Sequence, residues 1–183
     1  MSASTYVCLL RGINVSGHKM MKMDRLRACL ESIGLKEVRT YLQSGNAVFD
    51  VPAPLKKDLA KTIGSKIADD FGFTVPILVL SSKEWEKART ENPFLKEKGI
   101  DPGKLHVTFL ATAPATAALE KLALLKAGED QYREIGQRLY LYCPGGYGNT
   151  KLSNQAIERI LKVEATTRNW KTVNALAGML QKA

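Results

Sequence analysis

The stretch Val38-Arg-Thr-Tyr-Leu-Gln-Ser-Gly-Asn-Ala-Val-Phe-Asp-Val51 carries the clearest structural signal in this chain of 183 residues. Apolar and polar side chains alternate on both sides of the central Ser-Gly-Asn, as they do in two half-buried strands. Glycine and asparagine tolerate the positive φ of a tight turn, so we predict a β-hairpin. The uncharged side chains of Gln43, Ser44 and Asn46 can bind a ligand or hold the turn together.

The segments around this hairpin predict a complete small domain. Residues 6–13 are apolar on both faces and indicate a central strand, and a helix follows over residues 23–33. A second helix begins near Pro54, and a strand over residues 73–80 contains Pro76, which lacks a backbone donor and favours a sheet edge. The resulting order, βαββαβ, is that of a ferredoxin-like fold.

The second half repeats this order with one change. Ser81-Ser-Lys-Glu84 is a capping box that opens a helix, and the elements after it read βαββα. Where a final strand would belong, we expect a helix from about Thr167 to Leu180, capped by threonines. The predicted fold class is therefore α+β. It comprises two ferredoxin-like (βαββαβ-type) subdomains packed together, residues 1–80 and 81–183, the second modified with a C-terminal helix.

Composition indicates a soluble protein that spans no membrane. The chain is 45% hydrophobic, but no apolar run is long enough to cross a bilayer. The three cysteines, Cys8, Cys29 and Cys143, are odd in number and widely spaced, which is typical of reduced thiols in the cytoplasm.

The net charge of +9 is concentrated toward the two ends of the chain. Residues 1–80 carry 11 basic and 7 acidic side chains, residues 81–130 carry 8 of each, and residues 131–183 carry 8 and 3. This balance favours an anionic small molecule or nucleic acid as partner, or serves solubility alone.

Four segments resemble one known family: Leu9-Leu-Arg-Gly-Ile-Asn-Val15, Val38-Arg-Thr-Tyr-Leu-Gln-Ser-Gly-Asn46, Gly148-Asn-Thr-Lys-Leu-Ser-Asn154 and Ala165-Thr-Thr-Arg-Asn-Trp170. They are similar, in the same order, to the recurring blocks of the bacterial family catalogued as domain of unknown function 1697. The resemblance implies a soluble bacterial protein of two ferredoxin-like subdomains. It implies no activity, cofactor or catalytic residue.

Chain direction predicts where a ligand would bind. In a βαββαβ domain the loop after the first strand and the hairpin turn lie at the same end, so Arg11 and Asn14 should approach the polar turn, with Lys19 farther along the loop. A guanidinium and several amides at a helix start can bind an anion. Alternatively, Arg11 pairs with a carboxylate or with carbonyl groups of the hairpin, and the amides only hold the turn.

A glycine-rich loop over residues 143–153 is the second candidate. It resembles a phosphate-binding loop only weakly, because the glycine before Lys151 is missing, and a loop capped by Thr150 or Ser153 is the simpler interpretation. Arg168 beside Lys151 would extend a basic surface.

Other chemistries find little support. His18 and His106 are far apart and lack partners at ligand spacing, so we expect no metal site and no cofactor, and no nucleophile motif is present. The sequence favours a protein that binds an anionic ligand. An acylphosphatase-like hydrolase and a non-catalytic protein-interaction module remain as alternatives, and no catalytic residue is assigned.

Overall fold

The computed structural model describes residues 4–52 and 58–181. They form a mixed α+β fold with two four-stranded antiparallel sheets, in the strand orders β2-β3-β1-β4 and β6-β7-β5-β8. The chain divides into two compact units, Met1–Lys87 with Leu176–Ala183 and Ala88–Ala175.

The elements of the first unit are β1 (Ser4–Leu10), α1 (Met23–Ser32), β2 (Lys36–Tyr41), β3 (Asn46–Val51), α2 (Leu59–Phe71), β4 (Ile77–Ser81) and the start of α3 (Ser82–Thr90). The end of α3 belongs to the second unit. The predicted hairpin is confirmed: β2 and β3 are antiparallel, with Tyr41 opposite Asn46. The strand β1 is central and β4 lies at an edge, beginning directly after Pro76. The predicted start of the second helix at Pro54 lies outside the described residues.

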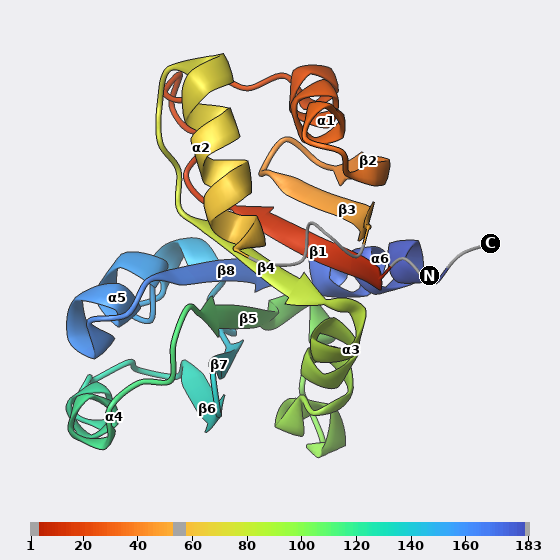
Figure 1. Ribbon diagram of the computed structural model, residues 1–183. Coiled ribbons are helices and arrows are strands. Elements are labelled where there is room, and N and C mark those ends of the chain that lie inside the picture. Colours follow the sequence, from red (N-terminus) through yellow and green to blue (C-terminus); the bar gives the residue numbers. More distant parts are fainter. Residues whose placement is uncertain (1–3, 53–57, 182–183) are drawn as a thin grey trace. The chain divides into compact units, whose positions relative to one another are not determined.

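One face of this sheet is covered by α1 and α2 (Figure 1). Leu26 and Leu30 of α1 and Ile63 and Ile67 of α2 are buried in the same cluster as Phe49 of β3. Burial of side chains of this size contributes about 1.5–3 kcal/mol each relative to an exposed position. The packing of two helices on one sheet face therefore stabilises the first unit.

The second unit contains the elements η2 (Pro93–Lys96), η3 (Pro102–Lys104), β5 (Leu105–Leu110), α4 (Thr116–Ala123), β6 (Gln131–Ile135), β7 (Arg138–Tyr142), η4 (Tyr147–Asn149), α5 (Asn154–Leu161) and β8 (Ala165–Asn169), and α6 (Trp170–Leu180) begins in it. Leu122, Leu139 and Ile157 bring α4, β7 and α5 into one buried cluster. The capping box that opens α3 is confirmed, since the Ser81 amide donates to Glu84 Oε2 (2.8 Å) and the Glu84 amide donates to Ser81 Oγ (3.3 Å).

The expectation that no strand precedes the last helix is wrong. Ala165–Asn169 forms β8, which pairs with β5, and Thr166 and Thr167 are strand residues opposite Phe109 and Thr108 rather than helix caps. The helix α6 begins only at Trp170, and Asn169 Oδ1 accepts from the Thr172 amide (2.8 Å) as its cap. A short polar strand at a sheet edge carries the same residue types as a helix start, which explains the error.

The three cysteines are free, in agreement with the prediction of reduced thiols, and all three are buried. Burial, together with a hydrogen bond to Asp70 and its charge, raises the pKa of Cys29 to about 12. None of the described helices is long and apolar enough to cross a membrane.

Gly45 joins the hairpin turn to the loop after β1. Its φ is +81°, and a Cβ atom at this position would lie 2.8 Å from both Ile13 Cδ1 and Leu10 Cβ. The turn therefore requires glycine for two independent reasons, the positive φ and the close approach of the loop.

We predict that Gly45→Ala lowers the free energy of unfolding by about 2–4 kcal/mol, because strain in the left-handed region adds to overpacking. Gly72→Ala is the matched control, since Gly72 has φ +75° and open space around it. It should cost only about 1 kcal/mol. Equal losses of stability in urea unfolding of the two variants would show that the close approach has no energetic consequence.

Candidate functional site

The loop after β1 meets the hairpin turn, as chain direction predicted. The Leu10 amide donates to the Gly45 carbonyl (2.8 Å), and Asn14 Nδ2 donates to the Gln43 carbonyl (2.8 Å). The two segments are about thirty residues apart in sequence and lie at the same end of the first unit.

Asn14 holds this junction together. Its Nδ2 also donates to the Met21 carbonyl (2.9 Å), and its Oδ1 accepts from the Met21 amide (2.7 Å). Both amide hydrogens and the amide oxygen are therefore engaged. Its φ of 53° is in the left-handed region, which asparagine tolerates better than most residues. Asn14 positions the loop and has no donor left for a ligand.

The turn side chains are also mostly structural. Asn46 is fully buried, and its Nδ2 donates to the Tyr41 carbonyl (2.8 Å) and to Ser44 Oγ (3.0 Å). These hydrogen bonds hold the turn together, and the prediction that Ser44 and Asn46 bind a ligand stays a prediction.

A pocket of about 600 Å³ lies beside this junction, where the loop enters α1. The described residues that line it are Asn14, Met20, Met21, Lys22, Arg25 and Gln43. Small-molecule sites in proteins occupy about 300–1,000 Å³, so the pocket is large enough for a small ligand.

Two cations line this pocket, and its described lining contains no carboxylate. Lys22 is exposed and precedes the first turn of α1, and its ammonium group makes no hydrogen bond or ion pair with any described residue. The side chain of Arg25 is held in place by two contacts with α2. Its Nη2 donates to the Asp70 carbonyl (3.1 Å), and its guanidinium carbon lies 4.8 Å from the centre of the Phe71 ring. The nearest acid in sequence, Asp24, forms an ion pair with Arg27.

Two of the predicted cations lie outside the pocket lining. The Arg11 amide donates to the Pro76 carbonyl (3.1 Å), and Lys19 Nζ donates to the Thr74 carbonyl (2.7 Å). Sequence reasoning missed Lys22 and Arg25. The available signal was the spacing of Lys19, Lys22 and Arg25, three residues apart at the start of a predicted helix.

Lys151 and Arg168 belong to the other unit. Lys151 is exposed after η4, whereas Arg168 lies on β8 opposite Val107 and donates from Nη1 to the Thr167 carbonyl (3.0 Å). They line no part of the pocket in the first unit.

A polar cluster surrounds Thr167 in this second unit. Thr167 Oγ1 donates to Asn154 Oδ1 (3.0 Å) and lies 2.8 Å from Thr108 Oγ1. The Asn154 amide donates to the Tyr147 hydroxyl (3.0 Å), and the Tyr147 ring stacks on His106 with 4.6 Å between the ring centres. These contacts join the glycine-rich loop to the sheet, and His106 packs as part of this cluster.

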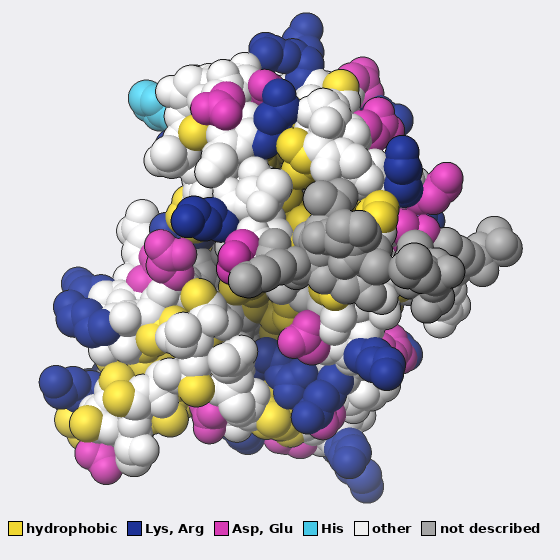
Figure 2. All heavy atoms as spheres, viewed as in Figure 1, with side chains coloured by type: hydrophobic (Ala, Val, Ile, Leu, Met, Phe, Trp, Pro, Cys, Tyr) yellow, Lys and Arg dark blue, Asp and Glu magenta, His cyan; other side chains and the backbone are white. Residues whose placement is uncertain are grey.

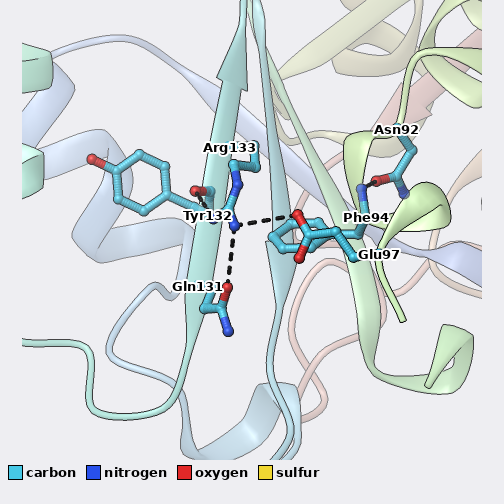
Figure 3. A network of polar contacts seen from close by, with 6 residues as sticks. All are labelled: Asn92, Phe94, Glu97, Gln131, Tyr132 and Arg133. Atoms are coloured by element: carbon cyan, nitrogen blue, oxygen red, sulfur yellow. Dashed lines mark hydrogen bonds and ion pairs between the residues drawn. The ribbon is translucent and has the colours of Figure 1, made fainter. Parts of the chain in front are cut away.

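A polar cluster surrounds Arg133 of β6 (Figure 3). Arg133 Nη2 donates to Glu97 Oε1 (3.2 Å) and Gln131 Oε1 (3.3 Å), and its guanidinium carbon lies 4.8 Å from the centre of the Phe94 ring. Asn92 Oδ1 accepts from the Phe94 amide (3.1 Å). This arginine ties η2 to the sheet and is already satisfied, so the cluster is structural. Within the described residues no group of three or more His, Cys, Asp or Glu side chains could hold a metal ion.

Comparison with known proteins identifies relatives of unknown function. A family model described as "Protein of unknown function (DUF1697)" matches residues 3–140. A solved structure of the conserved bacterial protein SP0830 from Streptococcus pneumoniae is similar, with a TM-score of 0.76 and 22% sequence identity, covering 98% of this chain and 100% of that one. At this identity the likeness shows the fold alone. No curated protein matches the chain.

Replacing Asn14 tests its role at the junction. Asn14→Asp preserves the tolerance of positive φ but removes both donors and places a carboxylate oxygen against carbonyl groups. We expect the free energy of unfolding to fall by about 1–3 kcal/mol. An unchanged midpoint of urea unfolding at neutral pH would contradict this role.

Burial lowers the pKa of His106, and its hydrogen bond to the Lys104 carbonyl opposes this shift only partly. Because the unfolded chain binds this proton more readily, the contribution of His106 to stability is fully present above its ordinary pKa of 6.5 and is lost as the pH falls below it. His106→Phe keeps a ring against Tyr147 but does not titrate. Below pH 6.5 the unfolding free energy of the wild type should therefore fall more steeply than that of the variant, and parallel curves would contradict the prediction.

Proposed function

The chain belongs to the DUF1697 family of proteins of unknown function, and we propose that it binds a small anionic ligand in the pocket beside the hairpin turn. The observation that carries this proposal is the lining of the pocket, which has two cations, no carboxylate among its described residues and about 600 Å³ of space.

The two cations are suited to different tasks. Arg25 is held by Asp70 and Phe71, so little side-chain entropy is lost when its remaining donors bind an oxyanion. Lys22 supplies a mobile charge with no competing partner in the described chain. It stands at the start of α1, a helix end that no described side chain caps, so backbone amides add partial positive charge. A phosphate or carboxylate group fits this combination.

A small molecule is favoured over a nucleic-acid backbone. A backbone partner requires a continuous basic surface that contacts many phosphates. On the face shown in Figure 2, Lys and Arg side chains are dispersed among Asp and Glu. The pocket, by contrast, is a local concave site with two charges.

The hydrolase alternative gains no support from the hairpin. An acylphosphatase-like reaction would need the Asn46 amide to face a substrate, but this side chain is fully buried and donates to Tyr41 and Ser44. A protein-interaction module remains a second candidate, because Val15, Met20 and Leu42 are exposed apolar side chains in the two loops.

We also propose that both units are ferredoxin-like. The order βαββαβ of the first unit and the matching strand orders of the two sheets support this proposal. The division into residues 1–80 and 81–183, the origin of the units by duplication and a cytoplasmic location remain predictions.

Titration with inorganic phosphate, followed by amide chemical shifts, tests the proposed function. The amides of Lys22, Arg25 and Gln43 should shift in the wild type, and Lys22→Met should weaken binding about three- to tenfold, the equivalent of one partly exposed ion pair. Lys83→Met, an exposed lysine on α3, is the control for the change in net charge. Equal weakening by both variants, or no saturable shifts at the pocket, would refute the proposal.

A further inference from the structure

The pocket combines its two cations with apolar side chains. Met21 is 2% exposed and Met20 is 64% exposed, and both line it. Val15, which follows Asn14, is 58% exposed, and Leu42, which precedes Gln43, is 55% exposed. Three of the five large hydrophobic side chains that stand exposed among the described residues therefore belong to the two loops joined at the pocket.

These loops also hold strained backbone. Of the seven described non-glycine residues with positive φ, four lie here: Asn14, Ser16, Lys19 and Leu42. Leucine at φ 59° costs about 1–2 kcal/mol relative to glycine, and because the side chain of Leu42 is 55% exposed, burial in the protein offsets only part of this cost. Backbone strain of this kind is concentrated at binding sites. There the strained backbone presents a side chain to the ligand, and contact with that side chain strengthens binding.

We infer that the ligand is an amphipathic anion, a phosphate or carboxylate head carrying an apolar chain. This inference rests on the proposed function, because the head binds Lys22 and Arg25. The chain lies along Met20 and Met21 and extends toward Leu42. Methionine suits this role, since its flexible thioether adapts to chains of different length and shape.

A series of monoalkyl phosphates tests the inference. Ethyl, butyl and hexyl phosphate stay monomeric in solution and differ only in the length of the chain, so calorimetric titration isolates its contribution, and inorganic phosphate is the reference that has no chain. In the wild type the affinity should rise about two- to fourfold for each methylene group that the pocket covers. Met20→Gln keeps the length of the side chain but removes its apolar character, and should flatten this rise.

Leu124→Gln is the matched control, because Leu124 is 81% exposed and belongs to the other unit. It should leave the whole series unchanged. Leu42→Asn is a second variant: it should raise the melting temperature, because asparagine tolerates positive φ, and should weaken hexyl phosphate more than ethyl phosphate. The inference is overturned if affinity is independent of chain length, or if it rises equally in the wild type and both loop variants.

The outcomes separate this inference from the proposed function. Phosphate binding that depends on Lys22 but ignores the chain overturns the inference alone. No binding of any member overturns both. Phosphatidylcholine vesicles with and without phosphatidic acid distinguish a soluble ligand from a lipid source. Binding both to the acidic vesicles and to hexyl phosphate supports a ligand with a phosphate head and an apolar chain. Binding to the acidic vesicles but to no soluble phosphate overturns the inference in favour of a membrane surface.

Discussion

The closeness of the Gly45 backbone to Ile13 and Leu10 is the constraint on which the rest of the first unit depends. No Cβ fits between the turn and the loop, so the loop after β1 packs directly on the hairpin. Once this approach is made, Asn14 reaches the Gln43 carbonyl and the Met21 backbone, and the chain enters α1 from a fixed point. The pocket exists because these segments are held at one place while Met20 and Lys22 remain on its exposed side.

The polar groups of this region divide into two kinds. Asn14 bonds to the backbone of Met21 and Gln43, and Asn46 donates to Ser44 and to the Tyr41 carbonyl, which keeps the junction rigid. Lys22, the outer donors of Arg25 and the methionine side chains are left to face the pocket. A site built in this way is preorganised, since the groups that would bind a ligand are supported by others that do not.

Much of this arrangement follows from sequence by elementary rules. Alternation along residues 38–51 specifies the hairpin, and strand direction then brings the loop of Asn14 to the turn. The lining of the pocket could not be derived in the same way, because which side chains of residues 20–25 face it depends on where α1 begins and how it is rotated. β8 was missed for a different reason: Thr-Thr-Arg-Asn suits a helix start or a short edge strand equally, and only pairing with Thr108 and Phe109 decides between them.

The burial of the three thiols has a consequence for redox chemistry. A cysteine that ionises only near pH 12, as Cys29 does, is almost entirely a thiol at neutral pH and reacts slowly with peroxide. The exposed thioether of Met20 has no such protection. Its oxidation to the sulfoxide would make an apolar wall of the pocket polar, so we expect an oxidant to alter this pocket before it modifies the buried cysteines.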